Sequence, residues 1–124
     1  MIRRALLLLA LPLAACSAPG AGAPSGEAVF RKCAICHRIG AAEGNAIGPN
    51  LHNVVGRKAG SLADFNYSPA MRATRFTWDE KKLDAFLTAP QRFVPGTKMT
   101  FSGLPDAPSR KAVIGYLKRN SGAR

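Results

Sequence analysis

The residues best suited to chemistry lie in one run of five, Cys33-Ala34-Ile35-Cys36-His37. Two thiols three residues apart occupy one face of a helix, and an imidazole follows them directly. This spacing is typical of covalent c-type haem attachment, in which the thiols add to the two vinyl groups and the histidine binds the iron. The motif therefore predicts a haem linked through Cys33 and Cys36, with His37 as an axial ligand.

Three other interpretations of the motif stay open at this point. A thioredoxin-like redox pair follows a strand, whereas the residues before Cys33 have a helical pattern. A structural zinc site needs two further ligands, and Cys16 and His52 are the only other cysteine and histidine in the chain. The motif could also occur by chance. Of these possibilities, haem attachment agrees best with the neighbouring sequence.

A haem iron with one histidine needs a second axial ligand or an open site, and Met71, Met99 and His52 are the candidates. Met71 falls in a short predicted helix, where a methionine is more often a packing residue. His52 lies in a loop and is expected to be solvated there. Met99 follows the Pro95-Gly96 turn in an extended segment. Its neutral thioether favours ferrous iron and raises the reduction potential, so Met99 is the predicted second ligand.

The composition restricts the function classes. A chain of 124 residues with 47% hydrophobic residues is one small globular domain and leaves no room for a separate cofactor module. Eighteen basic against seven acidic residues leave a formal charge of +11. Such an excess suits acidic partner proteins or anionic lipid. Nucleic acid is not expected as a partner, because no binding motif is present and the chain carries an export signal.

The N-terminus predicts export. Residues 1–15 combine two arginines with an apolar run that is too short to span a bilayer, which is typical of a signal peptide. Leu13-Ala14-Ala15-Cys16 resembles the lipobox of bacterial lipoproteins, so Cys16 is the predicted lipidation site, followed by a flexible linker over residues 16–25. The expected location is the periplasmic face of a bacterial membrane. Cleavage of an ordinary signal peptide, giving a soluble periplasmic protein, is the alternative.

The rest of the chain predicts an all-α domain over residues 26–120, with a tail at 121–124. We expect about three main helices: Gly26–His37, a helix capped by Thr77 and Glu80 that ends near Ala89, and one from residues 106–108 to Asn120. A short helix is expected at Ser68–Ala73. No alternating pattern predicts a sheet. The segment from Gly40 to Asn66 has no clear element, so a bound group must organise it.

Over residues 26–120 the sequence resembles the class I c-type cytochromes of the mitochondrial and bacterial c2 type. The resemblance implies the cytochrome c fold, in which long loops wrap around one covalently bound haem c, and it implies a monomer. Pro49 would accept a hydrogen bond from His37, and Arg57, Tyr67 and Trp78 would hold a haem propionate. The first and last helices would cross through Gly26, Phe30, Val113, Tyr116 and Leu117. The blocks that carry the resemblance are Cys33-Ala34-Ile35-Cys36-His37, Gly48-Pro49-Asn50-Leu51-His52, Gly56-Arg57-Lys58, Phe65-Asn66-Tyr67-Ser68, Thr77-Trp78 and Pro95-Gly96-Thr97-Lys98-Met99-Thr100-Phe101.

Two positions depart from the mitochondrial pattern. Phe86 stands where those proteins commonly have a tyrosine that donates a hydrogen bond near the methionine sulfur. Met71 stands where they commonly have an asparagine beside an internal water. Both changes make the expected haem pocket less polar, which affects the reduction potential and the strength of the bond to Met99.

The expected function is one-electron transfer between membrane redox partners of a respiratory or photosynthetic chain, with no substrate chemistry. Arg38, Arg92 and Lys98 are the expected docking residues for an acidic redox partner, because they are near Cys36 and Met99 in sequence; Lys32 and Lys58 are weaker candidates. Three alternatives remain: a soluble periplasmic carrier, a haem subunit of a larger complex, and a haem enzyme or gas binder if Met99 is labile.

Overall fold

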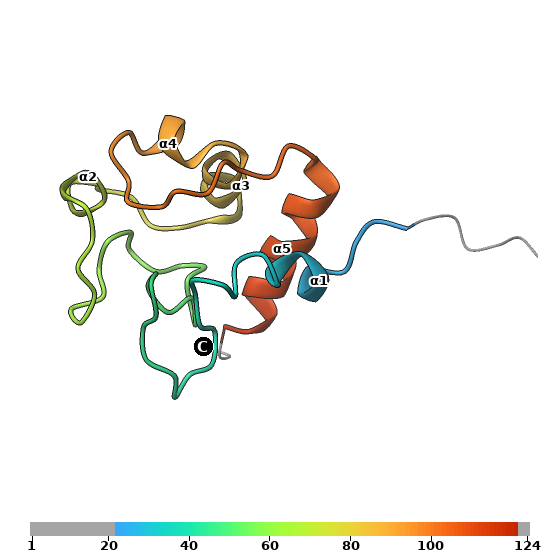
Figure 1. Cartoon of the computed structure of the whole chain (residues 1–124), viewed down its shortest axis with the longest axis horizontal. Helices are drawn as coiled ribbons and strands as arrows, with labels where there is room; N and C mark the ends of the chain where they lie inside the picture. The colour runs from blue at the N-terminus through green and yellow to red at the C-terminus, as the bar shows by residue number, and fades with distance from the viewer. Residues whose placement is uncertain (1–21, 122–124) are drawn as a thin grey trace, which may run out of the picture.

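The computed structural model describes residues 22–121 and shows an all-α chain with five helices in that range (Figure 1). The predicted signal peptide, Cys16 and the last three residues lie outside the described residues. The helices are α1 (Gly26–Phe30), α2 (Pro69–Arg72), α3 (Glu80–Thr88), α4 (Pro90–Phe93) and α5 (Ala107–Arg119). Between residues 22 and 121 no helix has the length and apolarity that a bilayer span requires.

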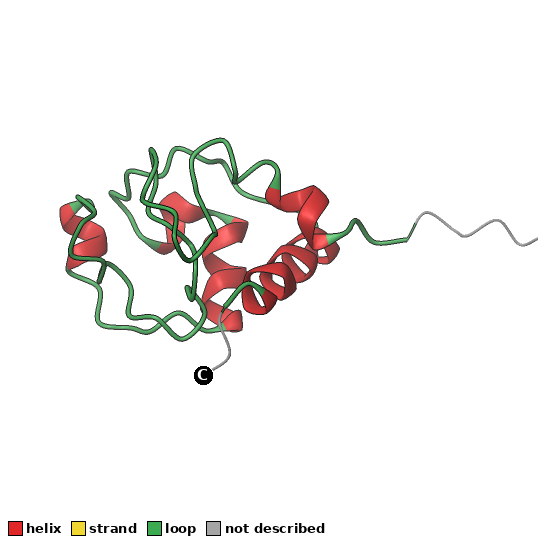
Figure 2. Cartoon of the chain, turned by 90° about the horizontal axis from the view of Figure 1, so that it is seen from below, coloured by secondary structure: helices red, strands yellow, loops and turns green. Residues whose placement is uncertain are grey.

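Helices α1 and α5 cross at one end of the molecule (Figures 1 and 2). Each begins with a side-chain cap: the Ser25 hydroxyl accepts from the Ala28 amide, and the Asp106 carboxylate accepts from the Ser109 amide. The backbones approach closely at Gly26, where an added Cβ would lie 2.2 Å from the carbonyl oxygen of Ala112. The close approach expected of Gly26 is therefore present.

The first helix is shorter than predicted. We expected it to run to His37, but α1 ends at Phe30 and a series of turns follows. In these turns the two patterns alternate: the Cys33 and Cys36 amides donate three residues back, to Phe30 (2.8 Å) and Cys33 (3.0 Å), whereas the Ala34 and His37 amides donate four residues back, to Phe30 and Cys33 at 2.9 Å each. The tighter turns end the regular helix just before the two cysteines.

The predicted capping box of the middle helix is wrong. Asp79, not Thr77, caps α3, and its carboxylate accepts from the Lys82 amide at 2.7 Å. Thr77 is held in extended backbone by an isolated antiparallel bridge to Lys58, so its hydroxyl is not at the helix end. Pro90, which directly follows the predicted end of this helix at Ala89, begins the short helix α4. The other two helices, α2 and α5, lie where the sequence predicts them.

The segment from Gly40 to Asn66 contains no helix or strand, as expected. It lies below α3 and α4 in Figure 1, drawn from teal to light green, and the chain between α4 and α5, in orange, runs across the molecule to the start of α5. Apolar side chains of α3 and α5 belong to one buried core, including Leu83, Phe86, Leu87, Val113 and Leu117.

Candidate haem site

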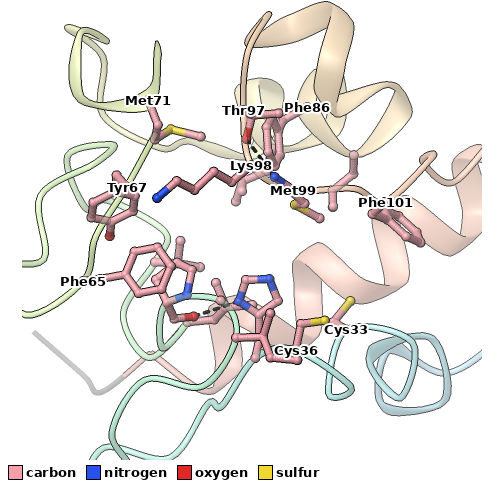
Figure 3. Close-up of a pocket in the computed structure, with 18 of the residues that line it drawn as sticks. Cys33, Cys36, Phe65, Tyr67, Met71, Phe86, Thr97, Lys98, Met99 and Phe101 are labelled. Carbon is pink, nitrogen blue, oxygen red and sulfur yellow. Dashed lines mark hydrogen bonds between the residues drawn. The ribbon is translucent and has the colours of Figure 1, made fainter. Parts of the chain in front are cut away.

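Helices and loops together enclose a cavity of about 380 Å³, whose lining is mainly apolar. Its lower wall in Figure 3 carries Cys33 and Cys36, and the opposite wall carries Met71, Phe86 and Met99. These residues come from distant parts of the sequence, so the fold brings the predicted attachment motif and both candidate methionines to one space. The cavity is thus the first place to test for a bound cofactor.

The two cysteines of the motif are free thiols at the cavity wall (Figure 3). Both are half-buried. Burial raises the pKa of the Cys33 thiol, and the neighbouring Lys32 ammonium partly opposes that shift. The turn that ends α1 presents both sulfurs toward the same cavity. They are therefore placed to bond one planar group along one edge.

His37 has a fixed ring orientation. Its Nδ1 lies 2.7 Å from the Pro49 carbonyl oxygen, which can only accept, so Nδ1 carries the proton. The other ring nitrogen, Nε2, then keeps its lone pair for a metal. Burial lowers the pKa of His37, the Pro49 carbonyl raises it by less, and Arg57 lowers it further. Gly48 lies against the ring, and a Cβ there would be 2.4 Å from its Cε1 atom.

Met99 is half-buried in the wall opposite the cysteines. Its backbone is held in place by neighbours: its amide donates to the Thr97 hydroxyl at 3.3 Å, the contact drawn in Figure 3. The Gln91 side-chain amide donates to the carbonyls of both Thr97 and Met99, at 2.9 Å each. Sequence reasoning missed Gln91, because nothing in the local pattern shows that a residue of α4 reaches this segment.

Asn50 organises the irregular loop beside His37. Its side-chain amide nitrogen donates to the carbonyls of Glu43 (2.7 Å) and Gly40 (3.0 Å), and its Oδ1 accepts from the His52 amide (2.7 Å). Its own amide donates to Asn45 Oδ1 at 2.8 Å. One buried side chain thus replaces the hydrogen bonds that a helix or strand would supply. The sequence pattern alone did not indicate this role for Asn50.

Arg57 brings a cation to the cavity. Its guanidinium donates to the carbonyls of His52 and Asn50, at 3.0 Å each, and burial lowers its pKa. No carboxylate pairs with it in the part of the chain that the structure describes. A half-buried cation without a counter-ion favours an anionic ligand group beside it.

Tyr67 and Trp78 line the cavity with Arg57, and both are buried. Arg57 and Trp78 are positioned by backbone pairing: the Trp78 amide donates to the Arg57 carbonyl at 2.8 Å, next to the bridge between Lys58 and Thr77. The Tyr67 hydroxyl accepts from the Leu62 amide at 3.4 Å, and burial is the main cause that raises the pKa of Tyr67. The structure thus brings together the residues expected around a propionate.

The expected docking residues are spread more widely. Lys98 lines the cavity, and its side chain crosses the opening to donate to the Asn66 carbonyl at 2.8 Å (Figure 3). Lys32 also lines the cavity. The other three cations are exposed but do not line it: Arg38, Lys58 and Arg92. The structure therefore separates two rim cations from three that lie elsewhere.

The alternative metal-site interpretation finds no support in the geometry. His52 is not part of the cavity wall, and its Nδ1 lies 3.2 Å from the Ile39 carbonyl oxygen. Across residues 22–121 no three His, Cys, Asp or Glu side chains gather as a metal site would require. The segment before Cys33 is the helix α1 rather than the strand of a thioredoxin-like redox site.

The donors around the cavity fit a haem. One wall offers two thiols and an imidazole with a free Nε2, and the other offers a thioether. The apolar lining suits a flat porphyrin, and the uncompensated guanidinium of Arg57 suits a propionate.

Comparison with known proteins decides the family. A cytochrome c2 from Rhodomicrobium vannielii is 49% identical over 107 residues, covering 86% of each chain. The chain belongs to the class I c-type cytochromes. A cytochrome c from Nigella damascena is 40% identical over 105 residues, covering 84% of this chain and 95% of its own. The chain is similar in structure to cytochrome cH from Methylobacterium extorquens, with a TM-score of 0.71 and 42% identity over 76% of this chain and 94% of that one.

Membership in this family settles several expectations. The predicted all-α cytochrome c fold is confirmed, and the cytochrome carries one covalently attached haem c. It is a monohaem electron carrier that acts with redox partner proteins. A search of protein-family models gave no match.

Proposed function

We propose that Cys33 and Cys36 form the two thioether links to the haem and that His37 and Met99 bind its iron from opposite sides. The observation that carries this assignment is the His37–Pro49 hydrogen bond of 2.7 Å, which aims Nε2 into a cavity whose far wall holds the Met99 thioether. When bound, the haem supplies an iron that changes between ferrous and ferric by one electron.

The protein residues around the cavity tune that change. The neutral Met99 thioether would favour the ferrous iron, and the Pro49 carbonyl makes His37 a better ligand by accepting a hydrogen bond from its Nδ1–H. The guanidinium of Arg57 compensates a propionate charge inside an apolar site, together with Tyr67 and Trp78. With His37 and Met99 both held to the iron, the protein would leave no coordination position open to a substrate.

The assignment is tested by replacing each methionine of the cavity in turn. Met99→Leu removes a ligand, so the ferrous protein should bind carbon monoxide near pH 7 and its reduction potential should fall. Met71→Leu is the matched control, because Met71 lines the same wall and is buried, yet holds no ligand role. Ready binding of carbon monoxide by the unchanged protein would instead favour a gas-binding or catalytic haem with a labile Met99.

The cellular setting of the cytochrome follows from its first sixteen residues. Export to the periplasm agrees with the signal-like residues 1–15, and Cys16 is the site of lipid attachment at the membrane surface. The exposed cations Arg38, Arg92 and Lys98 supply long-range attraction to an acidic redox partner. The intact mass of the mature protein tests the lipid anchor, because it reports covalent haem and acyl chains together. A mature chain that lacks acyl groups would contradict the anchor and leave the soluble carrier.

A further inference from the structure

The stretch that carries Met99, residues 97–103, has few backbone hydrogen bonds, and we call it the Met99 segment. At its start the Thr97 amide donates to the C-cap residue of α4 at 3.0 Å, and just beyond its end the Leu104 amide donates to a carbonyl of α3 at 2.7 Å. Between these points, residues 98–103 form no backbone-to-backbone hydrogen bond with the described part of the chain. Side chains must therefore hold Met99 in its place.

Gln91 of α4 is the one side chain from another element that bonds to the backbone of the Met99 segment within residues 22–121. Its amide nitrogen donates to the Thr97 carbonyl and to the Met99 carbonyl, at 2.9 Å each. A primary amide has two N–H groups, so one can serve each carbonyl, whereas a carboxylate could only accept. The Gln91 side chain is exposed, so water competes for both carbonyls and the net effect of the pair is modest.

The helix that carries Gln91 is firmly anchored. Its first residue, Pro90, is fully buried. Its last residue, Phe93, packs against the rings of Trp78 and Phe86, with centroid distances of 6.3 and 6.2 Å. Trp78 and Phe86 in turn line the haem cavity. The amide donor is therefore fixed relative to the cavity wall, and the Met99 segment is tied to that wall through it.

We propose that Gln91 is a positioning residue that keeps Met99 on the haem iron and thereby limits the access of outside ligands. The inference rests on the iron-ligand role proposed above for Met99, and it adds what slows the release of that ligand. The Met99 segment must move for Met99 to leave, and both hydrogen bonds from Gln91 are lost when it does. An outside ligand binds only the fraction of molecules in which Met99 has left, so its binding reports on Gln91.

The first test compares the native holoprotein with Gln91→Met, which keeps the length of the side chain and has no N–H donor. Carbon monoxide should bind to the ferrous variant, and imidazole to the ferric variant, about fivefold faster than to the native protein, as expected for two solvent-accessible hydrogen bonds. Gln91→Glu should give at least the same gain, because its carboxylate would face two carbonyl oxygens. Lys81→Met is the control, at an exposed position of α3 that does not line the cavity, and it should keep the native rates.

A second test shows whether Gln91 acts through Met99. Met99→Leu already removes the ligand, so adding Gln91→Met to it should not speed the binding of carbon monoxide further, whereas a general loosening of the protein would. The hydrogen bonds themselves are followed by NMR of the native holoprotein. Gln91 is the only glutamine of the chain, so its side-chain amide gives a single pair of glutamine signals, which should lie away from the free-amide position.

The outcomes separate the inference from the ligand assignment beneath it. If the native ferric protein shows the charge-transfer absorption of an iron–sulfur bond but Gln91→Met binds carbon monoxide at the native rate, the role of Gln91 is refuted and Met99 remains the ligand. An equal gain in Lys81→Met, a further gain on the Met99→Leu background, or glutamine signals at the free-amide position also refutes it. If the native protein lacks that absorption, the ligand role of Met99 and the role of Gln91 fail together.

Discussion

The two sides of the haem cavity are stabilised by different means. At the crossing of α1 and α5 the helices satisfy their own backbone groups, and close packing joins them, with Gly26 against Ala112 and the Phe30 and Tyr116 rings 5.1 Å apart. The loop from Gly40 to Asn66 has no such ladder; scattered backbone hydrogen bonds hold it together with the buried side chain of Asn50, which bonds the carbonyls of Gly40 and Glu43. The stability of the crossing therefore depends on the absence of a side chain at Gly26, whereas that of the loop depends on the hydrogen bonds of Asn50.

This difference predicts where the properties of the cytochrome are sensitive. A change at the crossing should lower stability and leave the reduction potential nearly unchanged, because Gly26 does not line the cavity. A change in the loop should alter both, because the loop carries the carbonyl that orients His37. Three substitutions test the contrast, each with a control in the same region, and a fourth probes the cavity wall beside Met99.

The largest effect is expected for Gly26→Ala. Its Cβ would lie 2.2 Å from the Ala112 oxygen and 2.6 Å from the Tyr116 Cβ, so a helix must shift, at a cost of about 3 kcal/mol. Gly115→Ala is the control: its Cβ meets only the flexible end of Arg119, and helix propensity should make it neutral or stabilising. Denaturant unfolding of the holoproteins measures both. Equal stability of the two variants would disprove the packing account.

Asn50→Ala should lower the free energy of unfolding by about 2 kcal/mol, because the part-buried carbonyls of Gly40 and Glu43 lose their donor and the His52 amide loses its acceptor. It should also shift the reduction potential, since Pro49 precedes Asn50 and holds His37. Asn66→Ala is the control, because that side chain is exposed and, within residues 22–121, hydrogen-bonds only to Arg72. Unfolding and voltammetry on the same samples separate the two effects. A destabilised Asn50 variant with an unchanged potential would mean that the loop does not position His37.

Gly48→Ala is expected to lower the free energy of unfolding by about 1–2 kcal/mol and to affect mainly the haem site. The new methyl group would lie 2.4 Å from the His37 Cε1 atom, so the ring must leave its hydrogen bond to Pro49. The yield of covalently loaded protein should fall, and the nitrogen-bound proton of His37 should shift in the NMR spectrum. Gly44→Ala, with no atom within 4 Å of its Cβ, should change neither.

The smallest effect, under about 1 kcal/mol, is expected for Phe86→Tyr, which adds a hydroxyl to the apolar wall near Met99. Met99 should then leave the iron at a lower pH than in the native protein. The charge-transfer absorption of the ferric iron–sulfur bond, titrated toward alkaline pH, measures this. Phe93→Tyr should leave the transition in place, because Phe93 does not line the cavity. A native transition at equal or lower pH than that of Phe86→Tyr would contradict the prediction.

Part of this cytochrome could be predicted from the sequence because its signals are local. Haem attachment needs two thiols and a histidine within five residues, and that spacing appears directly in residues 33–37. Helix α5 was found because its cap and apolar face lie close together in the chain. The N-cap of α3 was misplaced, since the bridge that removes Thr77 from the helix is formed with a segment nineteen residues away, at Lys58.

Only the tertiary structure decided what surrounds the attachment motif. The Pro49 carbonyl orients His37, Asn50 ties down the loop behind it, and Gln91 holds the backbone of Met99, and these contacts join residues 7 to 12 positions apart across turns of the chain. No local period records such contacts, because each depends on where a loop returns in space.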